Sequence, residues 1–102
     1  MFDLESHVKS AVLDQEHLAD VLRNNDDFDQ KIRARIVELA EQGLIEIYTY
    51  RGEDILTLTR LEAIAVLQCQ DNWCWETKAG TKCLYFLAPV INHLGHAKYG
   101  TN

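Results

Sequence analysis

The hydrophobic residues change their spacing at Gly43, and this change constrains the fold more than any other feature of the sequence. Before Gly43, apolar side chains recur at helical spacing from Phe28 to Leu39. After it, residues 44–50 alternate in a pattern rich in β-branched and aromatic side chains, which predicts a strand. Gly43 itself suits the position just after a helix, where a left-handed backbone is common. We therefore expect a helix that leads directly into a strand.

Two shorter helices are expected before this one. Apolar spacing predicts them over about residues 3–13 and 15–24, and Asp14 is the expected cap of the second. The third helix follows a run of Asn and Asp residues that favours a turn. Asp27, with Gln30 three residues later, resembles a capping box at its start.

A β-hairpin and a fourth helix are predicted next. Residues 51–54 form the expected tight turn, and residues 55–59 form the return strand. The helix over residues 60–70 has Thr59 as its expected N-cap and Glu62 at its third position, which is typical of a capping box. Because apolar residues surround most of its axis, we expect this helix to be buried on more than one side.

The last third of the chain allows two interpretations. The first is a second hairpin, formed by residues 72–77 and 81–88, with Pro89 beginning a short C-terminal helix. The second is one continuous helix, since four apolar residues share a helical stripe: Leu84, Leu87, Ile91 and Leu94. A proline inside that stripe argues against a continuous helix, so the hairpin is favoured.

Length and charge restrict the class of protein. A chain of 102 residues predicts one domain, with a core over about residues 3–70 and an extension over about residues 71–102. The net charge of −6 arises in residues 1–30, which hold eight acidic and two basic side chains. This excludes a strongly basic nucleic-acid binder and a polybasic membrane-surface protein. The start has no signal-peptide pattern, and three cysteines fit a reducing compartment, so a cytoplasmic protein without membrane contact is expected.

Three helices, a hairpin and a following helix, in this order, resemble a winged helix-turn-helix. Residues 17–22 resemble the first helix of the helix-turn-helix pair, and residues 41–45 resemble the junction into the wing. Residues 56–59 resemble the second wing strand of MarR-type regulators. The resemblance implies an α+β fold of three helices and a β-hairpin wing, with a C-terminal helix and a β/α extension. It also implies a dimeric DNA-binding regulator whose third helix enters the major groove.

The residues expected to contact DNA lie on the outward face and flanks of the third helix and at the tip of the wing. They are Gln30, Lys31, Arg33, Ala34, Arg35 and Arg51. Gln30 suits adenine, Ala34 suits the methyl group of thymine, and Lys31 suits guanine or phosphate. The arginines suit phosphates or the minor groove. The leading hypothesis is therefore a small transcriptional regulator that binds double-stranded DNA.

Acidic residues at the same place support a different hypothesis. Asp26, Asp27 and Asp29 begin the third helix, where they favour the helix dipole but repel phosphates. The alternative is an acidic protein-interaction module, or an inhibitor of the phage or mobile-element type that mimics DNA. It would bind a basic partner protein through the first two helices and these aspartates, together with Asp20. The simplest interpretation of the same charges is a solubilising surface.

The apolar fourth helix and the aromatic residues after it predict either a core cluster or a homodimer interface. The candidate interface residues are Leu61, Ile64, Trp73 and Trp75. No metal site is expected, because His93 and His96 are too close for zinc-ligand spacing and the cysteines form only one suitable pair. The chain has no glycine-flanked serine and no phosphate-binding glycine loop, so we expect neither a cofactor nor an enzyme.

Overall fold

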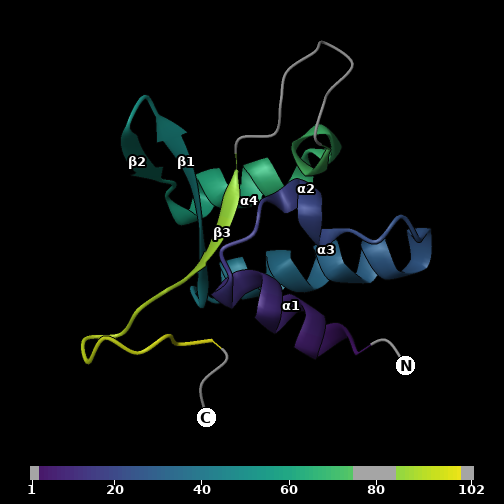
Figure 1. The fold of residues 1–102 in the computed structure, drawn as a ribbon, viewed down its shortest axis with the longest axis horizontal. Coiled ribbons are helices and arrows are strands. Elements are labelled where there is room, and N and C mark those ends of the chain that lie inside the picture. The colour runs from purple at the N-terminus through teal and green to yellow at the C-terminus, as the bar shows by residue number, and fades with distance from the viewer. Residues whose placement is uncertain (1–2, 75–84, 100–102) are drawn as a thin grey trace.

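The computed structural model describes residues 3–74 and 85–99, which form a mixed α+β fold. Helices precede and follow a β-hairpin, and a third strand comes from the C-terminal part (Figure 1). The elements in chain order are α1 (Leu4–Leu13), α2 (Leu18–Val21), α3 (Asp26–Glu41), β1 (Ile45–Arg51), β2 (Asp54–Thr57), α4 (Arg60–Gln68), the 3-10 helix η1 (Gln70–Trp73) and β3 (Phe86–Pro89). None of the described helices is long and apolar enough to cross a membrane.

The three strands form one antiparallel sheet in the order β2-β1-β3. In the centre of the sheet, Tyr48 faces Thr57 on β2 and Phe86 on β3. The outer edge of β3 is occupied by the segment between α1 and α2. There, the backbone N–H of Leu18 donates to Tyr85 O at 3.1 Å, and that of Leu87 donates to Glu16 O at 3.0 Å. Only β2 therefore borders the sheet without a described neighbour on its outer side.

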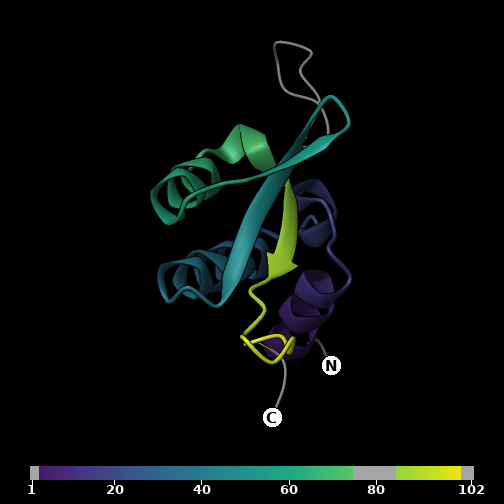
Figure 2. The same ribbon diagram turned by 90° about the vertical axis from the view of Figure 1, so that its left-hand side faces the viewer.

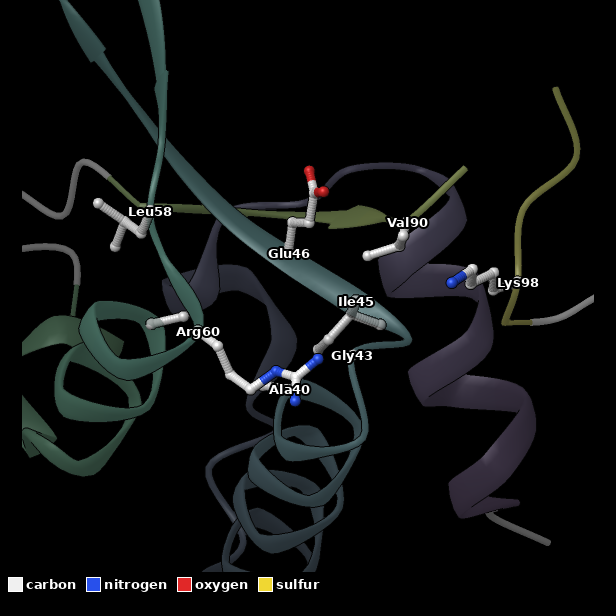
Figure 3. A pocket seen from close by; sticks show the side chains of 9 residues that line it. Ala40, Gly43, Ile45, Glu46, Leu58, Arg60, Val90 and Lys98 are labelled. Atoms are coloured by element: carbon white, nitrogen blue, oxygen red, sulfur yellow. The ribbon is translucent and has the colours of Figure 1, made fainter. Parts of the chain in front are cut away.

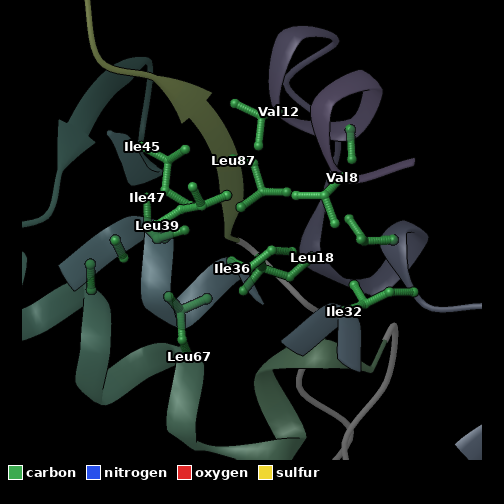
Figure 4. Packing of buried hydrophobic residues seen from close by; sticks show 14 of the residues in the cluster. Val8, Val12, Leu18, Ile32, Ile36, Leu39, Ile45, Ile47, Leu67 and Leu87 are labelled. Atoms are coloured by element: carbon green, nitrogen blue, oxygen red, sulfur yellow. The ribbon is translucent and has the colours of Figure 1, made fainter. Parts of the chain in front are cut away.

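Helices α3 and α4 lie against each other and contact β1, while α1 contacts both α3 and β3 (Figure 2). Their apolar faces meet in a single core, where side chains from α1, α3, α4 and the sheet point toward one another (Figure 4). The largest side chains with no exposed surface are Val8, Val12, Leu18, Val21, Ile32, Ile36, Leu39, Ile47 and Leu87. The C-terminal extension thus supplies part of the core through β3.

The two ends of α3 are stabilised differently from each other. Its C-terminal end confirms the prediction for Gly43, which has φ +73°. The backbone N–H of Leu44 donates to Leu39 O at 3.0 Å and that of Gly43 to Ala40 O at 3.1 Å, the pattern of a Schellman motif. At the start, the expected cap at Asp27 is wrong, because Asn25 caps the helix by accepting from the N–H of Phe28 at 3.2 Å.

The predicted helix over residues 15–24 is wrong in its extent. Helix α2 covers only Leu18–Val21, and Asp14 is the C-cap of α1 instead of the N-cap of α2. His17 has an extended backbone and forms a bridge with Phe86. Pairing with β3 therefore overrides the local helical pattern, because the two backbone hydrogen bonds around His17 require an extended chain.

The start of α4 is confirmed, whereas the prediction that it is buried on more than one side is wrong. The backbone N–H of Glu62 donates to Thr59 Oγ1 at 3.2 Å, and that of Thr59 donates to Glu62 Oε1 at 3.0 Å, which completes a capping box. Ala63 and Leu67 are the buried residues of the helix, and Leu61 is 81% exposed. Helix α4 therefore buries one narrow face.

The predicted second hairpin and C-terminal helix are also corrected by the structure. Strand β3 pairs with β1, and residues 72–74 belong to η1 and its end. Residues 75–84, which hold the rest of the expected hairpin, lie outside the described part of the chain. Pro89 ends β3, and residues 90–99 form a turn with a bridge between Ile91 and Ala97. Burial of Leu87 in the sheet explains why this segment is extended.

Candidate interaction surfaces

The exposed face of α3 has the composition that its helical spacing predicts. Gln30, Lys31 and Ala34 are all exposed along it. The ionised side chains that share this face and are exposed are Asp27, Lys31, Glu38 and Glu41. The face therefore holds three carboxylates and one ammonium group, a composition that offers little attraction for a phosphate backbone.

Arg35, one of the expected DNA contacts, is half-buried and paired with carboxylates of the same chain. Its Nε donates to Glu5 Oε1 on α1 at 2.7 Å, and its Nη1 donates to Glu38 Oε1. The hydroxyl of Tyr99 donates to the other oxygen of Glu5 at 3.1 Å. This Glu5–Arg35–Tyr99 cluster joins α1, α3 and the C-terminal segment, so Arg35 has a structural role on the flank of α3.

Tyr99 provides the clearest electrostatic perturbation in the described part of the chain. Burial, followed by the negative charge of Glu5, raises the pKa of Tyr99 to about 12. Because this pKa lies far above 7, the phenol remains protonated at neutral pH and donates to the carboxylate. In this cluster, the cationic Arg35 and the neutral phenol of Tyr99 both donate hydrogen bonds to the carboxylate of Glu5.

Arg33 lies on the other flank of α3, half-buried beside η1. It lines a pocket of about 230 Å³ together with residues of α3, η1 and the preceding turn: Leu22, Asp26, Asp29, Gln30, Gln70, Trp73 and Cys74. Asp29 accepts from the backbone N–H of Arg23 at 2.7 Å and so fixes the turn between α2 and α3. Arg33 therefore lies beside aspartate side chains at the edge of the helix.

The four aspartates proposed for a basic partner lie on α2 and the first turn of α3. Asp20, Asp26 and Asp27 are exposed, and Asp29 is half-buried. Because Asn25 provides the cap, Asp27 is not needed for it. Among the described residues, the side-chain carboxylates of Asp26 and Asp27 have no hydrogen bond or ion pair. The structure thus leaves two exposed carboxylates at one end of α3.

The residues expected at the tip of the wing and in the dimer interface differ in their exposure to solvent. Arg51 is exposed at the end of β1, opposite Asp54 in the register. Leu61 is exposed and Ile64 is half-buried. Trp73 is not available to a partner, because it is 2% exposed and its Nε1 donates to Leu67 O at 2.8 Å. Trp75 lies outside the described residues.

A second pocket, of about 290 Å³, was not expected from the sequence. Figure 3 shows the side chain of Arg60 directed toward Gly43, and Lys98 on the opposite side of the pocket. Glu46 lies on the strand between Arg60 and Lys98. These residues come from α4, β1 and the C-terminal segment, so no local spacing in the sequence brings them together. The charged side chains of its lining are two cations, Arg60 and Lys98, and one carboxylate, Glu46.

The thiols form no metal site in the described part of the chain. Cys69 and Cys74 are exposed and free, and Cys83 lies outside the described residues. Within residues 3–74 and 85–99, no group of three His, Cys, Asp or Glu side chains is placed to hold a metal ion.

Comparison with known proteins gives no further assignment. No protein-family model matches the sequence, and no match was found among curated proteins or solved structures.

Proposed function

We propose that this chain is a winged-helix domain that binds a basic protein through the acidic end of α3. The order of three helices followed by a β-hairpin supports the winged-helix assignment. The third strand of the sheet comes from the C-terminal extension, which makes this an unusual form of that architecture. The proposal does not depend on the architecture alone, since winged helices serve both DNA binding and protein binding.

The observation that carries the proposal is the state of Asp26 and Asp27. Both carboxylates are exposed in the first turn of α3, and neither has a partner among the described residues. Asp20 adds a third exposed carboxylate on the neighbouring helix α2. Because the carboxylates of Asp26 and Asp27 stabilise no contact within the described part of the chain, they are available to attract cationic side chains of another protein.

The charges of α3 also argue against DNA. Affinity for DNA comes largely from neutralising phosphates, and each carboxylate near a phosphate opposes it. Arg35, one of the three arginines of the expected contact set, is bound to Glu5 and Glu38. Lys31 is the only cation on the outward row, where it lies with Asp27 and Glu41. A basic protein surface therefore matches this helix better than a duplex does.

A labelled lysine- and arginine-rich peptide tests the proposal by fluorescence anisotropy. The double variant Asp26→Asn with Asp27→Asn is expected to bind about three- to tenfold more weakly at low salt, because two partly screened charge pairs are lost. The matched control, Glu53→Gln with Asp54→Asn, removes the same charge from the hairpin and is expected to bind as the wild type does. Equal losses in both variants, or no binding by the wild type, would contradict the proposal.

Binding to double-stranded DNA is the second candidate function, because Gln30, Lys31 and Ala34 are exposed in one row. It predicts duplex binding at about 50 mM salt that weakens steeply as the salt concentration rises. Lys31→Ala is expected to reduce that binding, whereas Lys98→Ala on the C-terminal segment is not. If the wild type does not bind double-stranded DNA at low salt, DNA binding is excluded as a function of this chain.

A further inference from the structure

The sheet has one edge that the described chain leaves open. The outer side of β3 is hydrogen-bonded to the segment around His17, whereas β2 lies at the outer border of the sheet in Figure 1. All four residues of β2 are exposed. An exposed edge strand offers its backbone groups to another strand, and proteins usually guard such edges with Lys, Pro or a bulge. The sequence of β2, Asp54–Thr57, contains no Lys or Pro, its one charged side chain is that of Asp54 at the start of the strand, and its register with β1 is regular.

The register identifies which backbone groups of β2 point outward. The N–H of Leu58 donates to Ile47 O at 2.9 Å, and Leu56 faces Thr49 in the same register. Because hydrogen-bonded and non-hydrogen-bonded pairs alternate in an antiparallel ladder, Leu56 and Leu58 direct their backbone groups toward β1. Ile55 and Thr57 therefore direct their N–H and C=O groups to the open edge.

The side chains at this edge are unusually apolar for a surface. Ile55 is 62% exposed and Leu56 is 46% exposed, so both faces of the short strand carry a large apolar side chain. Leu61, which follows in the first turn of α4, is 81% exposed. Tyr50, opposite Ile55 on β1, is 49% exposed. Ile55, Leu56 and Tyr50 thus place exposed apolar surface on β2 and the strand beside it, which is typical of a protein contact.

We propose that a second copy of this chain binds at this edge, with the two β2 strands antiparallel and the two-fold axis at Leu56. Ile55 of each copy then pairs with Thr57 of the other, which forms about four backbone hydrogen bonds. Leu56 meets Leu56 of the second copy on the axis, in a pair without backbone hydrogen bonds. The two sheets join into one continuous sheet, in a closed and self-complementary interface.

Neighbouring groups select this register over the others. An axis at Thr57 would pair Ile55 with Thr59, whose N–H already donates to Glu62 and whose carbonyl accepts from Ala63 N at 2.8 Å. An axis at Ile55 would pair Thr57 with Glu53, which lies in the turn. Only an axis at Leu56 pairs the outward N–H and C=O groups of Ile55 with those of Thr57 within the strand.

The charges at the edge are complementary to a second copy in the same arrangement. With the axis at Leu56, Glu53 lies opposite Thr59 of the second copy, at the N-terminal end of its α4. That end carries the positive pole of the helix dipole and begins with Arg60. A parallel arrangement of the two strands would instead bring the acidic turns together. The edge is thus complementary to itself in hydrogen bonding and in charge, independently of the function proposed above.

Cross-linking tests both the contact and its register. In a background with Cys69→Ser, Cys74→Ser and Cys83→Ser, the variant Leu56→Cys is expected to form a disulfide-linked dimer upon mild oxidation. The two Cα atoms of a facing pair without hydrogen bonds are about 4.5 Å apart, which suits a disulfide. Leu94→Cys, at another exposed leucine, is the control and is expected to remain largely monomeric. Equal cross-linking of both variants, or none of Leu56→Cys, would overturn the proposal.

Sedimentation equilibrium provides the second test. The wild type is expected to contain a species of twice the monomer mass at about 0.1 mM, and Leu56→Asp is expected to lack it because two carboxylates would face each other on the axis. Leu94→Asp is the matched control and should dimerise as the wild type does. Circular dichroism checks that both variants are folded. A monomeric wild type, or a dimer that Leu56→Asp leaves intact, would show that this edge is not the interface.

Discussion

Replacement of Tyr99 by Phe is expected to change how the stability of the protein depends on alkaline pH. Tyr99 donates a hydrogen bond to Glu5 at 3.1 Å and is 9% exposed. Burial, and then the charge of Glu5, raises its pKa from 10.0 to about 12. The folded protein therefore holds the phenol proton more tightly than the unfolded chain does. This contribution to stability is fully present below pH 10 and is lost as the pH rises through about 12.

The size of the effect follows from the same pKa. A rise from 10.0 to about 12 corresponds to at most about 2.7 kcal/mol of unfolding free energy. Solvent screening at the rim of the Glu5–Arg35–Tyr99 cluster reduces this to about 1–1.5 kcal/mol. At neutral pH, the Tyr99→Phe variant lacks a hydrogen bond to a carboxylate, which costs about 1–2 kcal/mol. The variant is therefore less stable than the wild type at pH 7, and the difference narrows at high pH.

Urea unfolding at about pH 8 measures the cost of losing the hydrogen bond, and its comparison with unfolding at about pH 11.5 measures the stability lost when Tyr99 ionises. Burial, and then the neighbouring Tyr50, also raises the pKa of Tyr48, so part of the alkaline loss remains in Tyr99→Phe. The control Tyr48→Phe is expected to keep the part of the alkaline loss of stability that is caused by ionisation of Tyr99. If Tyr99→Phe loses as much stability between the two pH values as the wild type does, the assignment of a buried phenol against Glu5 is refuted.

Three further substitutions test the fold by urea unfolding. Thr59→Ala removes the side-chain acceptor of the capping box and is expected to cost about 1 kcal/mol; an unchanged midpoint would contradict a role for that cap. Leu87→Ala opens a cavity at a fully buried side chain and is expected to cost about 3–5 kcal/mol, whereas a loss below about 1 kcal/mol would place β3 outside the core. Gly43→Ala puts a Cβ at φ +73°, which costs about 1–2 kcal/mol; a neutral result would mean that the left-handed turn is not required.

The elements that could be predicted from the sequence are those whose stabilising contacts are local. The capping box of Thr59 and Glu62 lies within four residues, and the turn at Gly43 follows directly from the end of one helical pattern. The exposed face of α3 follows from helical spacing alone, since Gln30 and Lys31 lie opposite the buried stripe. Each of these features depends on neighbours in the sequence and on no distant segment.

The features that could not be predicted depend on contacts between distant segments. The short extent of α2 results from backbone pairing of His17 with Phe86, a partner far along the chain. The same pairing determines the course of β3, because Leu87 completes the core beside Ile47. The ion pair of Arg35 was not predicted for a similar reason, since its partner Glu5 lies on another helix. No spacing within α3 marks Arg35 as different from Arg33.

The acidic bias of residues 1–30 is distributed among carboxylates with different roles. Asp3 accepts hydrogen bonds from Ser6 and caps α1, Glu5 binds Arg35, and Asp29 holds the backbone of Arg23. These three carboxylates stabilise the fold, so their charge does not measure the capacity to bind a partner. Asp26 and Asp27 have no such contact among the described residues. The net charge of this region therefore overstates the number of carboxylates without an internal contact, and two such carboxylates lie at one end of α3.

The acidic end of α3 and the open edge of β2 lie toward opposite sides of the molecule in Figure 1. A dimer through β2 would therefore present two acidic ends that face away from each other. Such an arrangement predicts avidity: a peptide with two basic segments, joined by a linker long enough to span both ends, binds the dimer more tightly than a peptide with one segment. Leu56→Asp is expected to remove this advantage while leaving the affinity for the single-segment peptide unchanged. Asp26→Asn with Asp27→Asn weakens both peptides. If Leu56→Asp also weakens the single-segment peptide, the two surfaces are not independent and the basic segment contacts the β2 edge.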